Sequence, residues 1–160
     1  MKKHIYLILS LLCAALIFFL SSQDATTSDT LSKQVTSTVN ETAGAGLSNE
    51  EMRSIVHFAL FLLLGVLTTS WLSTKVATRS ITHSKDQEAT TKTTKSNVKT
   101  VIVALGACVV YAITDELHQG FFVEGRGFEL IDLAKDWGGS LCGIAGVAML
   151  RRIRKNRAAY

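Results

Sequence analysis

The sequence predicts an all-α integral membrane protein, a bundle of four membrane-crossing helices with both chain ends on the same side. Two observations support this prediction. Hydrophobic residues make up 48% of the 160 residues and are gathered into four blocks, a segregation that small soluble domains do not show. Lysine and arginine gather before the first block, between the second and third, and after the fourth. Such basic segments stay in the cytoplasm.

The first apolar block covers about residues 5–22 and follows Lys2 and Lys3. Basic residues before a short apolar run are also typical of a cleaved signal peptide. No pair of small residues with the spacing of a cleavage site follows this run. We therefore expect a retained membrane helix, with a cleaved signal peptide as the alternative.

The segment between the first and second blocks is rich in serine, threonine and alanine, with Leu31, Val35 and Val39 at every fourth position. This spacing predicts a short amphipathic helix lying on the outer surface, and a disordered loop is the alternative. Ser48 and the two glutamates that follow it predict an N-terminal cap for the next helix.

The other three blocks predict helices over about 53–72, 98–117 and 131–150. Each is close to the roughly 20 residues that a spanning helix needs. Residues 73–97 are rich in threonine and lysine and are expected to form a flexible cytoplasmic linker. The whole chain, residues 1–160, is expected to form a single membrane domain.

The distribution of basic residues sets the expected orientation. Most of the 17 lysine and arginine residues lie in the N-terminus, the linker and the C-terminal tail. We expect these three segments and both termini in the cytoplasm of a multi-pass cell-membrane protein. The positive charge then reflects topology, so the lipid bilayer is the expected partner and nucleic acid is not.

The fourth predicted helix carries Asp132, Asp136, Gly139, Gly143 and Gly146 at steps of four, three, four and three. This spacing places all five on one helical face. Membrane helices pack where small residues allow their backbones to approach. The three glycines therefore predict a packing face, and the two carboxylates are expected to point toward protein rather than lipid.

A second polar group lies at the outer end of the third predicted helix, where Asp115, His118 and Gln119 would share one face if the helix continues through them. Ionisable groups at a membrane boundary usually face a protein interior or a watery cavity. Together with residues at the same depth of other helices they predict an outward-facing acidic pocket made of His57, Asp115, Glu116, His118, Gln119, Arg126, Asp132 and Asp136.

Three interpretations of this pocket are open. In the first, ion pairs of Arg126 with Asp132 or Glu116 hold the helices together. In the second, the pocket performs acid and base chemistry or recognises a polar ligand, such as an envelope lipid or a lipid-linked molecule. The catalytic candidates are then Asp115, Glu116 and His118, and the binding residues are His57, Gln119, Arg126, Asp132 and Asp136.

The third interpretation is a divalent metal site that uses His57, Glu116, His118 or an aspartate. The chain has no metal-binding motif of the His-x-x-x-His type. The three cysteines lie in different apolar blocks, with no ligand or redox spacing. We therefore assign no metal ligand and no cofactor from the sequence.

Four motifs together resemble the VanZ-like family. They are FFLSSQ at the end of the first block, HF followed by LLLG in the second, DELHQ followed by Phe and Gly-Arg after the third, and D-x-x-x-D-x-x-G-x-x-x-G in the fourth. The resemblance covers all four predicted helices. The chain departs from the usual family pattern in having Val123 and Glu124 before Gly125 and Arg126, where a proline is common, and in having Asp136 where asparagine is frequent.

The resemblance implies a small bacterial membrane protein related to a determinant of resistance to the glycopeptide teicoplanin. We expect a multi-pass protein whose pocket affects envelope properties or teicoplanin susceptibility. The alternative is an intramembrane enzyme that acts on an envelope lipid or lipid-linked sugar by acid and base chemistry.

Overall fold

The computed structural model describes residues 2–23, 25–44, 46–83 and 89–157. Five helices occur in this part of the chain: α1 (Lys2–Ser21), α2 (Ala25–Ala43), α3 (Asn49–His83), α4 (Ala89–Phe122) and α5 (Leu130–Arg157). The described residues contain no strand. The predicted all-α class is confirmed, and α2 is the additional helix expected between the first and second apolar blocks.

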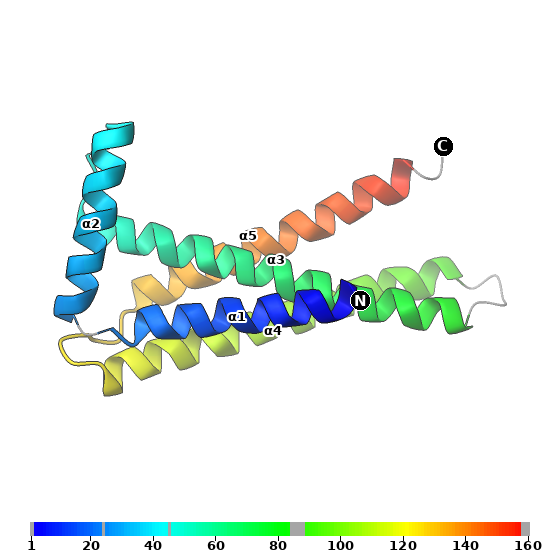
Figure 1. Cartoon of the computed structure of the whole chain (residues 1–160). Coiled ribbons are helices and arrows are strands. Elements are labelled where there is room, and N and C mark those ends of the chain that lie inside the picture. Colours follow the sequence, from blue (N-terminus) through cyan, green and yellow to red (C-terminus); the bar gives the residue numbers. More distant parts are fainter. Residues whose placement is uncertain (1, 24, 45, 84–88, 158–160) are drawn as a thin grey trace.

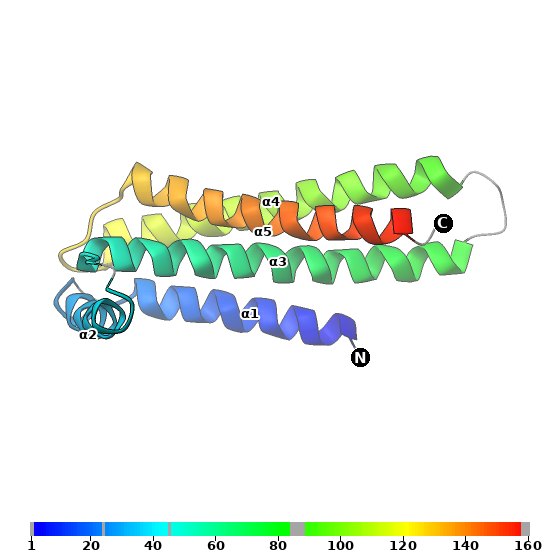
Figure 2. The same cartoon turned by 90° about the horizontal axis from the view of Figure 1, so that it is seen from above.

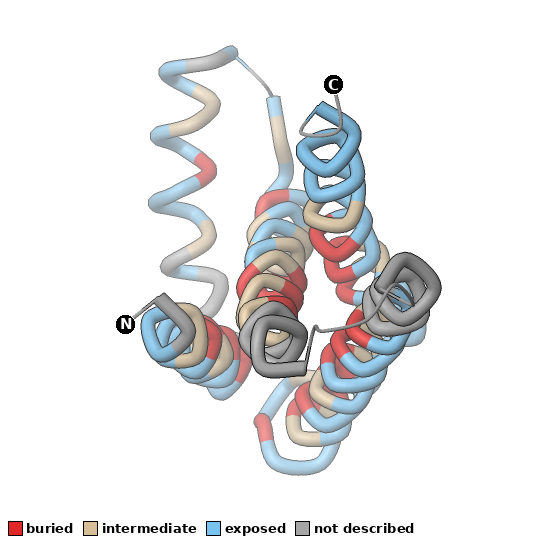
Figure 3. The backbone as a smooth tube through the Cα atoms, turned by 90° about the vertical axis from the view of Figure 1, so that its right-hand side faces the viewer, coloured by how far each residue is buried: buried red, intermediate tan, exposed pale blue. Residues whose placement is uncertain are grey.

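Four long helices run side by side, and α2 lies across one end of them (Figures 1 and 2). Helix α3 is at the centre and contacts each of the other four. Figure 3 shows this arrangement along the bundle, with α1 on one side of α3 and with α4 and α5 on the other. The most extensive contact is between α3 and α5.

The segment between the first and second apolar blocks forms helix α2. The helix expected there is confirmed, and the alternative, a disordered loop, is wrong. Helix α2 ends where Gly44 adopts φ 63°, a left-handed conformation that glycine takes without strain. The Asn40 side chain then holds the turn, donating to the Leu47 carbonyl (3.0 Å) and accepting from the Leu47 backbone N–H (2.9 Å).

Helix α3 begins with a reciprocal cap. The Ser48 backbone N–H donates to Glu51 Oε2 (2.8 Å), and the Glu51 N–H donates to Ser48 Oγ (3.2 Å). The predicted cap is confirmed.

Helices α3 and α4 are longer than the sequence predicted. Helix α3 continues to His83 and α4 begins at Ala89, so the expected linker over 73–97 is helical except at 84–88, which lie outside the described residues. The chain has no proline, and no glycine lies between Gly65 and Gly106. Without a residue that interrupts the backbone hydrogen bonds, the helices extend beyond their apolar parts.

Among the described residues, three helices are long and apolar enough to cross a membrane, over His4–Ser21, Asn49–Thr74 and Val98–Phe122. Helix α5 has 28 residues but is not one of them. Asp132, Lys135 and Asp136 lie in its first two turns and lower its hydropathy. The apolar character expected over 131–150 is therefore weaker than predicted.

The contact between α3 and α5 depends on glycine. A Cβ atom at Gly139 would collide with the backbone carbonyl of Phe58, and one at Gly143 with that of Leu62. A Cβ at Gly65 of α3 would lie 2.6 Å from the Ser140 carbonyl oxygen. The predicted packing face therefore exists around Gly139 and Gly143. It does not include Gly146, where a Cβ would meet nothing within 4 Å.

The hydrophobic core lies mainly between α1, α3 and α4, where it contains Ile17, Phe61, Cys108 and Ala112, and α5 adds Leu133. The start of α1, the end of α3, the start of α4 and the end of α5 point toward one end of the bundle (Figure 1). The opposite end holds α2 and the loop between α4 and α5. That second end carries the polar side chains described next.

Candidate functional site

Two aspartate side chains are buried at the α2 end of the bundle. Asp115 of α4 is 2% exposed and Asp136 of α5 is 0% exposed. Helix α4 continues through Asp115 to Phe122, as the predicted shared face required. The close glycine contact at Gly139, one turn after Asp136, brings the start of α5 against α3. Local helix length and glycine packing thus bring both carboxylates into the protein.

Asp115 is held by a chain of hydrogen bonds from three segments. Ser21 Oγ, at the end of α1, donates to Asp115 Oδ2 (2.7 Å). Gln119 Nε2, one turn later in α4, donates to the same oxygen (3.0 Å), and Gln119 Oε1 accepts from Arg126 Nη1 (2.8 Å). These bonds fix the orientation of the carboxylate and leave Asp115 Oδ1, which is buried, with no hydrogen-bond partner.

Asp136 has a different environment. Its Oδ1 lies 3.7 Å from Nδ1 of His57, a residue of α3. Neither of its two buried carboxylate oxygens has a hydrogen-bond partner. Burial of a carboxylate without hydrogen bonds is costly unless a charge or a ligand compensates it. Asp136 is therefore the most unusual polar side chain of the site.

His57, Asp115 and Asp136 converge, although they come from three different helices. Each offers one atom, a ring nitrogen or a carboxylate oxygen, and these three atoms lie within 4.8 Å of one another. Such a group can share a proton or hold a cation.

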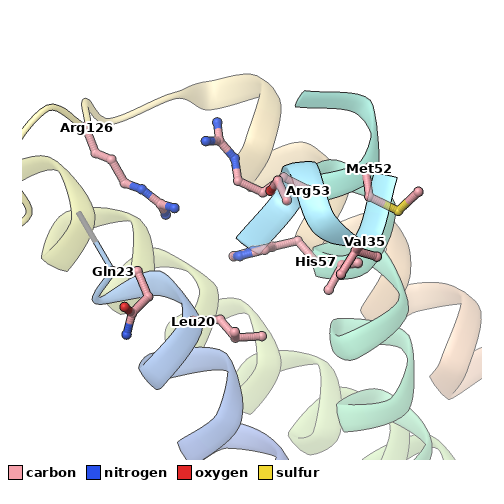
Figure 4. Close-up of a pocket in the computed structure, with 9 residues that line it drawn as sticks. Leu20, Gln23, Val35, Met52, Arg53, His57 and Arg126 are labelled. Atoms are coloured by element: carbon pink, nitrogen blue, oxygen red, sulfur yellow. The ribbon is translucent and has the colours of Figure 1, made fainter. Parts of the chain in front are cut away.

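A pocket of about 110 Å³ opens next to this group. Its apolar wall comes from α1, α2 and α3, through Leu20, Val35, Met52 and Val56. Its charged wall comes from Arg53 and Arg126, with His57 between them and the buried carboxylates. Figure 4 shows the Arg126 guanidinium and the His57 ring extending toward the same space, from the loop after α4 and from α3.

Two arginines dominate the charged wall of the pocket. Burial lowers the pKa of the Arg126 guanidinium, and the positive charge of Arg53 lowers it further, while Asp115 and Glu116 oppose the shift. Two arginines close enough to repel each other are stabilised by a negative group that binds between them. Together with the apolar wall, this arrangement suits a ligand with an anionic head and an apolar part.

The other predicted site residues lie around this centre. Glu116 is buried and its Oε2 accepts from the backbone N–H of Glu129 (3.1 Å), which holds the loop before α5. The His118 ring lies against Phe18 and Phe122, with centroids 4.6 and 5.7 Å apart. It is not one of the three converging residues.

Asp132 lies outside the buried group. Its Oδ1 accepts from Lys135 Nζ (2.6 Å), which also donates to Ser54 Oγ (2.8 Å). The sequence placed Asp132 and Asp136 on one face, but α5 crosses α3 at an angle, so only Asp136 points into the contact. Asp132 and Lys135 instead tie the exposed start of α5 to α3.

The sequence prediction did not include Ser21, Arg53 or Lys135 in the site. Ser21 belongs to the FFLSSQ motif on which the resemblance rests, and that motif was the available signal. Arg53 lies one turn before His57, and this spacing was the available signal for it. Nothing in the sequence indicated that Lys135 takes part in the site.

Long, apolar, mutually packed helices with a buried polar group at one end define a helical membrane protein. A family model described as VanZ/LLP1 matches residues 6–151, nearly the whole chain. The chain therefore belongs to the VanZ-like family, as the motifs indicated. Comparison with curated proteins and with solved structures found no match.

Proposed function

We propose that this protein is a multi-pass protein of the bacterial cell membrane in which α1, α3, α4 and α5 cross the bilayer. Both termini are cytoplasmic, and the polar site faces the outer side. The concentration of lysine and arginine near one end of the bundle supports this orientation.

The assignment of α5 as a fourth span is supported by its packing. The charged residues that lower its hydropathy contact protein. Asp136 is buried against α3, and Asp132 and Lys135 pair with each other near the helix start. The following turns expose Leu141, Met149 and Leu150, which suits contact with acyl chains.

The orientation is testable by labelling single cysteines with a membrane-impermeant maleimide in whole cells. Glu124, in the loop before α5, and Arg154, near its end, are both exposed. A Glu124→Cys variant is expected to react in intact cells, and an Arg154→Cys variant only after the membrane is permeabilised. The three natural cysteines are replaced first. The reverse pattern would contradict the proposed orientation.

The proposed activity is recognition of an anionic, lipid-linked ligand of the bacterial envelope in the outer leaflet, with a lowered susceptibility to teicoplanin as its consequence. The observation that supports it most is the pocket in which Arg53 and Arg126 face an apolar wall beside buried carboxylates. Family membership supports the link to glycopeptides.

An enzyme is the second candidate. Asp115 and Asp136 keep buried carboxylate oxygens without hydrogen-bond partners next to an open pocket, an arrangement found where carboxylates act as acids or bases. The substrate would be an envelope lipid or lipid-linked sugar bound in the same pocket. Glu116 and His118, the other sequence candidates, have structural contacts with the loop before α5 and with two phenylalanine rings.

Deletion of the gene followed by complementation tests the proposal. Loss of the protein is expected to raise susceptibility to teicoplanin more than to vancomycin, and the wild-type gene should restore it. An Arg126→Gln variant is expected to fail to restore it at an unchanged protein level, because the anion site is lost. Asp132→Asn, outside the pocket, is the matched control.

Unchanged susceptibility to both antibiotics after deletion would contradict the link to glycopeptides. The Asp115→Asn variant distinguishes the binding protein from the enzyme. A binding protein retains part of its effect when this charge is removed, whereas an enzyme that uses the carboxylate loses all of it.

A further inference from the structure

We propose that His57, Asp115 and Asp136 form a binding site for one divalent transition-metal ion of the zinc or manganese class. The three candidate ligand atoms come from α3, α4 and α5 and lie within 4.8 Å of one another. This site goes beyond the proposed role in the envelope and rests on the geometry of the three side chains alone.

The distances suit a metal ion after a small adjustment. Ligand atoms about 2.1 Å from a Zn²⁺ ion are about 3 to 4 Å from one another. The three candidate atoms, all within 4.8 Å of one another, lie close to that range.

Charge and burial point to a cation rather than to a neutral contact. Asp136 is fully buried, and neither of its oxygens has a hydrogen-bond partner. Asp115 Oδ1 is also buried without a partner, while its Oδ2 accepts from Ser21 and Gln119. The unpartnered oxygens therefore belong to both carboxylates of the same group. A divalent ion balances the charge of the two carboxylates and supplies the missing interaction.

The surrounding hydrogen bonds resemble those of built metal sites, in which second partners orient the ligands. Ser21 and Gln119 hold Oδ2 of Asp115, which leaves Oδ1 free of hydrogen bonds. Arg126 in turn holds Gln119. One imidazole and two carboxylates, with no thiolate, favour Zn²⁺ or Mn²⁺ over softer ions.

Three protein ligands leave at least one coordination position for water or another ligand. His57 also lines the pocket, together with Arg53 and Arg126. An oxyanion that enters this pocket meets the two guanidinium groups and reaches the open position of the ion. The metal site and the pocket thus form one binding surface for an anionic head group.

Sequence spacing could not reveal this site. The three ligands are 58 and 21 positions apart, and none of the short spacings of common metal motifs applies. The group exists only because glycine brings α5 against α3 and because α4 continues past Asp115.

Metal binding to the purified full-length protein in detergent tests the proposal. The protein is stripped with a chelator, incubated with Zn²⁺ or Mn²⁺ alone, desalted and analysed for bound metal and for its unfolding temperature. We expect about one ion per chain and an unfolding temperature that rises with metal concentration. Asp136→Asn and His57→Gln are expected to lower the affinity by about 100-fold or more, and Gln119→Leu by about 10-fold, because it only orients a ligand.

Asp132→Asn is the matched control, since it removes an aspartate from the same helix but outside the group. It is expected to bind metal as the wild type does. No bound metal in the wild type, or equal binding by the Asp136→Asn and wild-type proteins, would overturn the site. The wild type could bind no metal while Asp136→Asn is more stable than the wild type without metal. That result would show that the buried Asp136 carboxyl group is protonated and that the metal site does not exist.

If Asp136→Asn does not accumulate, His57→Gln decides, because this side chain is partly exposed and tolerates replacement better. The measurement uses no antibiotic and no cells. Failure of the susceptibility experiment therefore leaves the metal site standing, and failure of metal binding leaves the glycopeptide role to be judged on its own test.

Discussion

Helices α1 and α5 use their side chains in opposite ways. Helix α1 is the more apolar of the two and exposes many large hydrophobic side chains, among them Leu11, Leu12 and Phe19. Helix α5 falls short of the apolar character of a candidate span, yet it makes the most extensive contact with the central helix. Its buried residues include Asp136, Gly139, Ser140 and Gly143.

The difference indicates whether each helix mainly contacts lipid or protein. In water, the apolar face of a helix turns inward because burial is favourable. In a bilayer this drive is absent between helices, and close packing and polar contacts hold them together. The hydrophobic side chains of α1 therefore suit lipid, and the small and polar side chains of α5 are the ones that suit contact with protein. Of these two helices, the more polar one, α5, is consequently the one that supplies a carboxylate to the buried group.

The largest expected effect comes from filling the space between α3 and α5. In Gly143→Leu the new side chain would collide with the backbone carbonyl of Leu62, which cannot rotate away. Overpacking at such a position is expected to cost about 3 kcal/mol, measured as a lower unfolding temperature in detergent and less folded protein in the membrane. Gly146→Leu is the control, because nothing lies within 4 Å of that position. Equal effects of the two variants would show that α5 does not pack as described.

A smaller effect is expected inside α1, where a buried and an exposed residue can be compared. Ile17 is 0% exposed and Leu12 is 60% exposed. Ile17→Ala leaves a cavity in the core and is expected to cost about 2 kcal/mol, the low end of the range for such changes, because the bilayer is itself apolar. Leu12→Ala is expected to change the unfolding free energy by less than about 0.5 kcal/mol. A cost at Leu12 as large as at Ile17 would indicate a partner on the exposed face of α1.

The positions of the long helices could largely be predicted from the sequence, because apolar blocks and a cap at Ser48 mark them. Their ends could not. Composition alone made residues 73–97 resemble a linker, but helices end where a residue interrupts them, and this segment has no proline or glycine. Helix α2 was only one of two expectations, because its apolar stripe is weak. Its side chain at Thr36 is buried instead of the one at Val35.

The site could be predicted in part. Periodicity placed Asp115 and Gln119 together and directed Asp136 inward, and both hold in the structure. Periodicity does not give the partners across helices. Those depend on the crossing of α3 and α5, which separates Asp132 from Asp136, and on the ring contacts of His118.

The smallest effect concerns the contact between α1 and α4, which is slight compared with that between α3 and α5. Tyr111 Oη of α4 donates to the Ala14 carbonyl of α1 (2.6 Å). Tyr111→Phe removes this bond while keeping the ring against Phe61, and is expected to lower the unfolding free energy by about 0.6 kcal/mol, the average for such bonds in membranes. Thr114→Ala is the control, because the Thr114 hydroxyl bonds within its own helix, to the Val110 carbonyl. Unfolding in detergent measures both. A loss at Tyr111 no larger than at Thr114 would mean that the Tyr111 bond adds nothing to the contact between α1 and α4, and that the Ser21 bond to Asp115 and apolar packing hold α1 in place.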